Sequence, residues 1–347
     1  MITAIHDAVL QLLPAKRKSS PSGWISFNAP CCVYNGESAD KRNRGGVKTN
    51  TEGSVSYHCF NCNFKASYVP GRSLSYKFRK LLGWLGASDN EVHKLVIDAV
   101  RIKELVNPED VKPAEPERDI AFKVRPLPEQ ARTFSEWGTW HTLQAEDPKY
   151  VNVPADFGNA VLYASNRKIN LDRYELYWTP ESEHHYSKRV IIPFYWKGQL
   201  IGSTARTFVD GIKPKYYSDY EPNYVFNLDQ QHDDNPFVIV VEGPFDAMAI
   251  DGVAILSNEC SDVQAEIIDN LGKEVIVVAD ADRAGTKLID AALKHRWAVS
   301  YPIWQETHKD VASAVEEFGR LFVLKSILEA KETSRLKIEL KKKKLYN

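Results

Sequence analysis

Three uninterrupted apolar runs in the second half of the chain constrain its fold more than any other feature. They do not alternate with polar residues, and segments with the helical spacing of apolar side chains separate them. Uninterrupted β-branched runs divided by helices are typical of buried parallel strands with crossover connections. We therefore expect an α/β sheet built from FVIVV at 237–241, GVAIL at 252–256 and EVIVV at 274–278.

Acidic side chains directly follow two of these runs. Glu242 comes after FVIVV in the motif EGPFDA, with Asp246 four residues later. Asp280 and Asp282 come in DADRAG, where a spacing of two aims both carboxylates to one side of an extended segment or tight turn. Sites in parallel sheets lie outside the carboxyl ends of the strands, so both motifs should arrive at one edge. Converging carboxylates favour Mg²⁺, which binds one or two of them and leaves positions for phosphates.

Two glycines and a further acid accompany these motifs. Gly243 and Gly285 would allow a close approach of the backbone beside the site. Asp310, in HKDVA, is a further candidate ligand. The alternative is that these acids cap helices and turns, which is common for an isolated Asp after a strand. Two motifs at two strand ends favour the metal site.

Four of the five cysteines lie before residue 63. Cys59 and Cys62 form CFNC, a spacing that lets two thiolates reach one tetrahedral ion. Cys31 and Cys32 lie earlier, across a Gly-rich basic stretch, and would complete a zinc ribbon that holds a structural Zn²⁺. Adjacent side chains on an extended chain point to opposite faces, so both can bind only if the backbone bends sharply between them. His58 is an alternative fourth ligand, and buried thiols without a metal are the alternative to the whole site.

The N-terminal region is strongly basic. Residues 1–86 carry 12 Lys and Arg against 4 acids, although the net charge of the chain is −1. Such a region suits a polyanion, and rings beside cations can stack bases and bind phosphates of a single strand. For any one ring, membership of a small aromatic core is the alternative. The set is Trp24, Phe27, Tyr57, Phe60 and Phe64 with Lys41, Arg42, Arg44, Lys48 and Lys65.

The remaining segments indicate how the chain is organised. Helical spacing over 75–85 and 90–106 predicts a pair of helices, and the Pro-rich, charged segment 107–118 is typical of a linker. Residues 119–186 contain no motif that we recognise. The segment 331–347 carries seven Lys and Arg against two acids, and we expect a frayed helix or a disordered arm.

The two acidic motifs together resemble the Toprim domain shared by bacterial-type primases, topoisomerases, and some nucleases and recombination proteins. DADRAG is similar to the form found in DnaG-type bacterial primases. The segment RVIIPFYWKGQLIGSTARTFVDGIKPKYY, at 189–217, resembles the basic half of their RNA polymerase domain, and HKDVA resembles a later acidic motif. With the zinc ribbon, the resemblance spans most of the chain, and its length and Cys-x-x-Cys details look closest to T-even bacteriophage primases.

The resemblance implies an α/β chain, α+β overall, in five parts. These are a zinc-ribbon template-binding domain at 1–86, a helical segment and linker at 87–118, the basic N-terminal part of an RNA polymerase domain at 119–236, a Toprim domain at 237–320 and a basic C-terminal tail at 321–347.

The resemblance also implies a DNA primase, which makes short RNA primers on single-stranded DNA for lagging-strand replication by Mg²⁺-dependent nucleotidyl transfer. Glu242, Asp280 and Asp282 would then be catalytic. The same three residues with Asp246 and Asp310 would hold Mg²⁺, or Mn²⁺ in its place. The phosphates of the template or of the ribonucleoside triphosphates would be bound by Arg189, Arg206, Lys213 and Lys215.

Two other classes of function compete with this one. A Toprim nuclease or topoisomerase would share the acidic motifs, but a topoisomerase needs a nucleophilic Tyr in a separate large domain, for which the chain is short. A binding module with a degenerate Toprim domain is opposed by the intact set of Glu242, Asp280 and Asp282.

Partners and location complete the expectations. No G-x-x-x-x-G-K-[ST] loop occurs, so a replicative helicase would be a separate partner, and a single-stranded-DNA-binding protein is a further candidate. The apolar runs are far shorter than the roughly 18 residues of a membrane span. The N-terminus has no basic stretch before its apolar residues, as a secretory signal would. We expect a cytoplasmic protein, in the host cytoplasm if the chain is viral.

Overall fold

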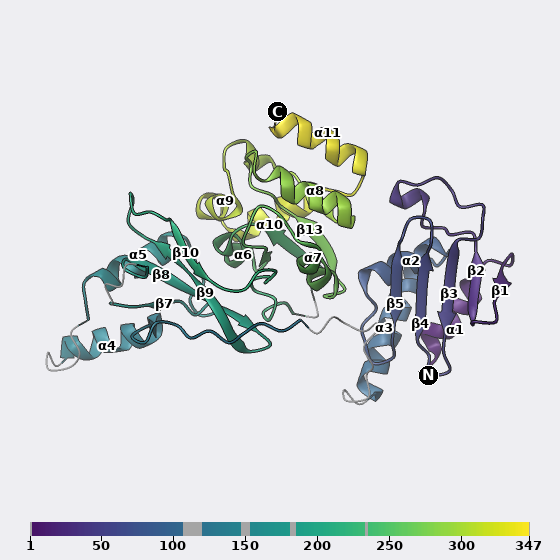
Figure 1. The fold of residues 1–347 in the computed structure, drawn as a ribbon, viewed down its shortest axis with the longest axis horizontal. Coiled ribbons are helices and arrows are strands. Elements are labelled where there is room, and N and C mark those ends of the chain that lie inside the picture. Colours follow the sequence, from purple (N-terminus) through teal and green to yellow (C-terminus); the bar gives the residue numbers. More distant parts are fainter. Residues whose placement is uncertain (1, 107–119, 147–152, 181–184, 233–234, 347) are drawn as a thin grey trace. The chain divides into compact units, whose positions relative to one another are not determined.

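The computed structural model shows a mixed α/β chain, as predicted, whose described residues form two compact units (Figure 1). The first comprises Met1–Ile120 with Asp269–Glu274, and the second Ala121–Ile268 with Val275–Asn347. Within them, the described residues are 2–106, 120–146, 153–180, 185–232 and 235–346. The expected linker at 107–118 lies outside these residues. Among them, no helix is long and apolar enough to cross a membrane.

An antiparallel sheet forms the centre of the first unit. Its strands follow one another in chain order and pair with their neighbours throughout. Burial alternates along β4, because successive side chains of a strand point to opposite faces. One face is therefore core and the other is solvated. The strands are β1 Lys18–Ser19, β2 Trp24–Phe27, β3 Gly45–Thr49, β4 Val55–Cys59 and β5 Lys65–Tyr68.

Helices complete the core of the first unit. The predicted helical pair is present as α2 Tyr76–Trp84 and α3 Asp89–Leu105. The Ser88 hydroxyl accepts the N–H of Glu91, and the Glu91 carboxylate accepts the N–H of Ser88, a capping box that fixes where α3 begins. These helices, together with α1 Ala4–Leu12, contribute apolar side chains to the core beneath the sheet.

The second unit contains an antiparallel sheet of order β10-β9-β8-β7-β6. The segment 119–186, where the sequence shows no motif, supplies β6, β7 and two helices, α4 Phe134–Glu146 and α5 Asp156–Asn166. The long hairpin of β8 and β9 lies within the segment 189–217 that resembles part of an RNA polymerase domain. The strands are β6 Arg132–Thr133, β7 Tyr177–Trp178, β8 Arg189–Trp196, β9 Gln199–Thr207 and β10 Tyr216–Asp219.

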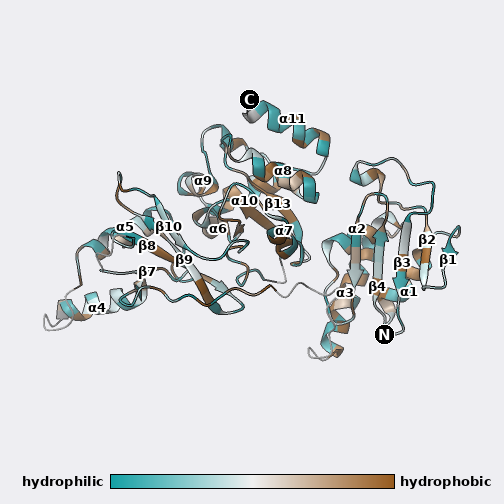
Figure 2. Ribbon diagram, viewed as in Figure 1, coloured by the Kyte–Doolittle hydropathy of each residue, from teal (hydrophilic) through white to brown (hydrophobic). Residues whose placement is uncertain are grey.

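A further sheet of the second unit has the order β12-β11-β13-β14-β15. β11 pairs with β12, and β13 with β14, in parallel, whereas β15 pairs with β14 antiparallel. The residues of the central strands are hydrophobic, whereas α11 combines many hydrophilic residues with a few hydrophobic ones (Figure 2). The strands are β11 Phe237–Val241, β12 Val253–Ala254, β13 Glu274–Val277, β14 Ala298–Ser300 and β15 Lys331–Glu332.

Helices cover this sheet. α6 packs with α9 and α10, and α11 packs on α8. β14 ends at Ser300, because Pro302 cannot donate to a ladder and a 3₁₀-helix, η3 Ile303–Glu306, follows. The helices are α6 Pro244–Ile250, α7 Asp262–Asp269, α8 Thr286–His295, α9 Val311–Phe318, α10 Arg320–Glu329 and α11 Arg335–Tyr346.

Candidate functional site

Four cysteine thiols meet in the first unit, as the sequence predicts. The Sγ atoms of Cys31, Cys32, Cys59 and Cys62 all lie within 4.8 Å of one another, and all four residues are buried. The Sγ–Sγ distance is 3.5 Å both for Cys31 and Cys62 and for Cys32 and Cys59. One pair ends β4 and begins the following turn, and the other precedes the 3₁₀-helix η1 Val33–Asn35.

The backbone bend that the adjacent cysteines require is supplied by η1. Cys32 has helical dihedrals (φ −58°, ψ −49°), and its carbonyl accepts the N–H groups of Asn35 and Glu37, each at 3.0 Å. His58 is not part of the cluster. It lies on β4 opposite Gly46, with its ring centroid 4.2 Å from that of Phe60.

The donor set fits a zinc ion. Four sulfur ligands at one point are typical of structural zinc sites. The amides of Asn35 and Asn61 donate to the sulfurs of Cys62 (3.5 Å) and Cys32 (3.3 Å), as hydrogen-bond donors around a metal thiolate do. The contact with Cys62, together with burial, raises the pKa of Cys31, and burial raises that of Cys32 to about 11. A cation is therefore what would hold these thiols as thiolates.

In the second unit, carboxylates gather where β11 and β13 end. Glu242 directly follows β11, and its Oε1 accepts the N–H of Asp280, 3.2 Å away. Asp246 lies in the first turn of α6 and accepts the N–H of Ala312 at 2.8 Å. Asp310 is the N-cap of α9, as the alternative interpretation of these acids expects. Its charge also acts on Asp246 and Asp280, so it belongs to the acidic cluster as well.

Burial and mutual repulsion raise the pKa values of three of these acids. Burial, then the charge of Asp280, raises the pKa of Glu242 to about 7. Burial, then the charge of Asp310, raises the pKa of Asp246 to about 8 and that of Asp280 to about 6. The site therefore holds more negative charge than its surroundings stabilise, which a bound cation would correct.

Lys309 contacts this cluster, although the sequence did not predict it as a site residue. Its Nζ lies 2.8 Å from Asp282 Oδ2 and 3.5 Å from Asp280 Oδ2. Burial alone would raise the pKa of Asp282. Hydrogen bonds from Lys309 and from the N–H groups of Gly285 and Ala284 outweigh this effect, so the pKa of Asp282 is lowered. The motif HKDVA contains Lys309, and its position beside Asp310 was the signal available.

The backbone approaches the acidic site closely at both glycines, and at Gly285 it leaves no room for a side chain. A Cβ on Gly285 would lie 2.2 Å from the Asp280 carbonyl oxygen and 3.1 Å from Glu242 Oε1. A Cβ on Gly243 would lie 2.7 Å from Asp246 Oδ2. Several oxygen ligands with one lysine beside them match what Mg²⁺ prefers, so the residues present fit that ion.

The predicted phosphate ligands differ in their surroundings. Arg206, on β9, donates from Nε to the Tyr163 hydroxyl at 3.2 Å and lies 4.7 Å from the centroid of the Tyr216 ring. Lys213 and Lys215 are exposed in the connection from β9 to β10. These three residues can reach a ligand from solvent.

Arg189 requires a correction to the predicted set of phosphate ligands. Its side chain is buried, with 1% of the residue exposed. The guanidinium donates to the carbonyls of Ala205 (3.3 Å), Pro214 (2.6 Å) and Lys215 (2.8 Å). Because main-chain acceptors occupy it, Arg189 fixes the β9–β10 connection, and we do not assign it to phosphate binding.

Arg167 is a cation near the acidic site that the sequence did not predict. It follows α5 and lies 5.0 Å from the ring centroid of Tyr163 and 4.9 Å from that of Phe245, the residue before Asp246. Its charge acts to lower the pKa of Asp246. The sequence holds the i, i+4 spacing of Tyr163 and Arg167, but nothing local shows that α5 faces α6.

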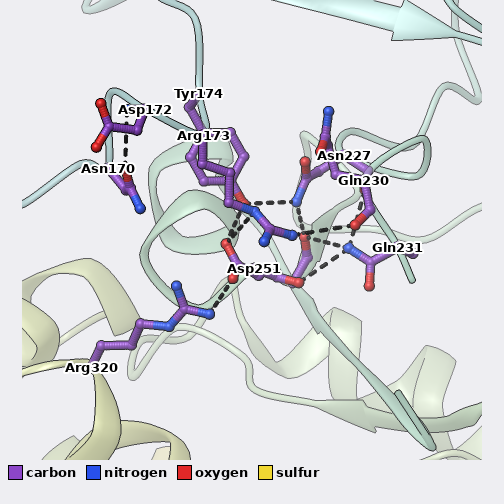
Figure 3. Close-up of polar contacts among 10 residues, drawn as sticks. Asn170, Asp172, Arg173, Tyr174, Asn227, Gln230, Gln231, Asp251 and Arg320 are labelled. Carbon is purple, nitrogen blue, oxygen red and sulfur yellow. Dashed lines mark hydrogen bonds and ion pairs between the residues drawn. The ribbon is translucent and has the colours of Figure 1, made fainter. Parts of the chain in front are cut away.

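A polar cluster fixes the other end of α6 (Figure 3). Asp251, the C-cap of this helix, accepts a hydrogen bond from the Tyr174 hydroxyl at 2.7 Å and pairs with Arg173 Nε at 3.0 Å and with Arg320. Asn227 donates to the Tyr174 hydroxyl at 3.2 Å. Side chains from the segment before β7, from the turn at Asn227 and from the start of α10 thereby hold the end of the helix that carries Asp246.

Comparisons with known proteins agree with the predicted resemblance. No family model matches the chain. The DNA primase of Aquifex aeolicus (strain VF5) is 26% identical over 154 residues, which is 39% of this chain and 31% of that protein. The chain therefore matches less than a third of the length of this curated relative. The match confirms a resemblance to DNA primases, whereas the closer likeness to T-even bacteriophage primases stays a prediction.

Solved primase structures are distantly similar. The zinc-binding and RNA polymerase domains of Aquifex aeolicus primase cover 94% of this chain and 83% of that one, with 17% identity and a TM-score of 0.44. The RNA polymerase domain of Mycobacterium tuberculosis DnaG covers 57% and 82%, with 15% identity and a TM-score of 0.45. A DnaG catalytic domain bound to single-stranded DNA covers 56% and 78%, with 16% identity and a TM-score of 0.43.

Proposed function

We propose that the chain is a DNA primase, a nucleotidyltransferase that joins ribonucleotides on a single-stranded DNA template. The observation that carries the proposal is the cluster of carboxylates at the ends of β11 and β13, with raised pKa values and a lysine beside them. The buried thiol cluster in the same chain and the 26% identity to a DNA primase support it.

The proposed chemistry assigns separate tasks to the acids. A 3′-hydroxyl must lose its proton as it attacks an α-phosphate, and Glu242, with a pKa of about 7, is suited to accept one near neutral pH. Asp246, Asp280, Asp282 and Asp310 would hold Mg²⁺ or Mn²⁺. The ion supplies charge stabilisation of the attacking and leaving oxygens when bound.

Cations around the acids would orient the phosphates. Lys309 lies against Asp280 and Asp282, where a phosphate bound to the same acids through the metal would come within its reach. Arg206 and Arg167 both contact Tyr163, beside α6, and offer bidentate guanidinium groups. The exposed Lys213 and Lys215 would add point charges.

One face of the first unit's sheet suits the template. Phe27, Tyr57 and Phe64 are buried core rings, whereas Phe60 is 63% exposed and its ring contacts those of Trp24 and His58. Cross-strand pairing places Lys48 opposite Trp24 and Lys65 opposite His58, and paired residues share a face of the sheet. Rings alternating with cations are what single-strand binding uses.

The test is ribonucleotide incorporation on random single-stranded DNA with Mg²⁺ and all four ribonucleoside triphosphates. We expect short RNA products from the wild type, and a loss of at least about 100-fold in Glu242→Ala, the order of a general-base contribution. Asp280→Ala should also lose activity, because it removes a proposed ligand of the metal ion. Glu306→Ala, at an exposed acid of the same unit, is the matched control. Mg²⁺-dependent cutting or relaxation of DNA without RNA synthesis would instead support the nuclease or topoisomerase alternative.

The separate helicase, the single-stranded-DNA-binding protein, the cytoplasmic location and the division into five domains remain predictions from the sequence. The chemistry of the acidic site does not depend on them.

A further inference from the structure

A groove with a basic lining starts beside the acidic site. It has a volume of about 430 Å³ and runs between α8 and α11. We call it the α8–α11 groove. Its polar lining is Arg283, Thr286 and Asp290 from the side of α8, and Glu339, Lys342 and Lys343 from α11.

The wall formed by α11 is firmly held, which differs from the frayed helix or disordered arm expected from the sequence. Ile338 is 1% exposed, and its carbonyl accepts the Tyr301 hydroxyl at 3.0 Å. Lys342 Nζ lies 2.5 Å from Asp290 Oδ1, which joins α11 to α8 directly. β15, just before α11, pairs with β14. α11 therefore lies in a fixed position along α8 (Figure 1).

The charges of the groove are unequally compensated. Asp290 pairs with Lys342, and Glu339 pairs with Arg335 at 3.1 Å, so both carboxylates of the lining are already neutralised. Arg283 and Lys343 are exposed, and in the part of the chain that the structure describes neither side chain has a carboxylate partner. The groove thus offers two uncompensated cations to an anion.

The groove is continuous with the acidic motif. Arg283 directly follows Asp282, whose Oδ1 accepts the N–H groups of Ala284 (2.8 Å) and Gly285 (3.0 Å). From Thr286 the lining extends seven residues along α8 to Leu293, or about 10 Å at 1.5 Å per residue, and Arg283 lies just before this helix. A strand that follows this lining can therefore bring more than one of its phosphates near Arg283 and Lys343.

We propose that the α8–α11 groove binds the phosphate backbone of a nucleic acid strand as it leaves the acidic site. Arg283 contacts the phosphate nearest the site and Lys343 one farther along. The shared chemistry is a single-stranded polynucleotide, with the template DNA and the RNA product as its two sources. The inference rests on the proposed function, because it takes the acidic site as the place where the strand ends or is extended.

The test measures the salt dependence of binding of labelled oligo(dT) and oligo(rU) to the full chain in Mg²⁺-free buffer. Each phosphate contact contributes about −0.7 to the slope of log K against log salt for a single strand. Lys343→Ala should weaken binding and make the slope shallower by about 0.7. Asp290→Asn should do the opposite, because it releases Lys342 for a phosphate. Lys325→Ala, at an exposed lysine of α10 paired with Glu329, is the control and should leave the slope unchanged.

The opposite signs of the two variants separate phosphate contact from loosening of α11, which would weaken binding in both. A larger effect on oligo(rU) identifies the RNA product as the occupant, and a larger effect on oligo(dT) identifies the template. Slopes unchanged in both variants, or weaker binding in both, would overturn the proposal. If the wild type makes primers while the slopes stay unchanged, only the groove assignment fails. If the slopes change as expected and no primers form, the proposed function fails alone.

Discussion

At the scale of single residues, Asp246 has the most strongly perturbed environment of the acidic site. Its carboxylate is buried, accepts one backbone N–H and faces the charges of Asp310 and Asp280. Without a cation, its pKa of about 8 means that the folded state keeps this proton to a far higher pH than the unfolded state, where the ordinary value is 3.8. Between about pH 4 and pH 8 the folded state therefore binds more protons, and stability falls as pH rises.

We expect Asp246→Asn to be more stable than the wild type at pH 8 in the absence of metal. The difference in the free energy of unfolding should be at least about 1 kcal/mol, since one pKa unit corresponds to about 1.4 kcal/mol. It should vanish below about pH 3, where Asp246 is protonated in both states of the wild type. Urea unfolding in EDTA at the two pH values measures it, with the exposed Glu306→Gln as control. Equal pH profiles for Asp246→Asn and the wild type would contradict the assigned environment.

Local spacing explains which site residues the sequence could predict. Glu242 and Asp280 follow the ends of strands, and the four cysteines lie in or beside tight turns. The local pattern alone therefore predicts that the two acids meet at one site and the four cysteines at another. Arg189 and Arg167 could not be assigned in this way. Whether an arginine meets backbone carbonyls or an acidic cluster depends on which distant element packs against it, and that information is tertiary.

At the scale of elements, the thiol cluster connects two loops that strand pairing does not hold together. It joins the turn after β4 to the turn around η1, two segments of a small unit whose core is limited. Bound zinc would contribute folding free energy directly. The expected zinc ribbon therefore makes a prediction about stability as well as about metal content.

We expect Cys59→Ser to lower the zinc content of the purified protein well below one ion per chain and to reduce its thermal stability. Chelation of the wild type should have the same effect on the unfolding transition. Elemental analysis and thermal unfolding are the measurements. Cys260→Ser replaces a buried cysteine of the second unit, outside the cluster, and should keep the zinc. Full zinc occupancy in Cys59→Ser would show that the cluster is not the metal site.

Element length separates what the sequence predicts from what it misses. β11 and β8 are long enough to appear as apolar runs, and α3 is long enough for its helical period to be recognised. β6 and β15 have two residues each, and two residues have no period. They exist because a neighbouring strand offers them hydrogen bonds, which is why the C-terminal segment joins a sheet where the sequence suggested an arm.

At the scale of the whole molecule, two units with separate cores carry two kinds of surface. The first has the thiol cluster and an exposed face of rings and cations, and the second has the acidic cluster. The excess of basic residues over 1–86 already indicates this division in the sequence. If the face binds template and the acids perform chemistry, the two activities should be separable by substitution.

We expect Phe60→Ala to weaken binding of single-stranded DNA by about 1 to 3 kcal/mol, the contribution of one stacked base. Glu242→Gln should abolish ribonucleotide incorporation while leaving that affinity within about twofold of the wild type, because its side chain lies in the other unit. Fluorescence anisotropy and primer synthesis measure the two activities on the same preparations. Phe322→Ala removes an exposed ring of the second unit and should change neither activity. Equal loss of affinity in Phe60→Ala and Phe322→Ala would mean that the ring face does not bind the strand, and the template would then have to be held by the cations of the second unit.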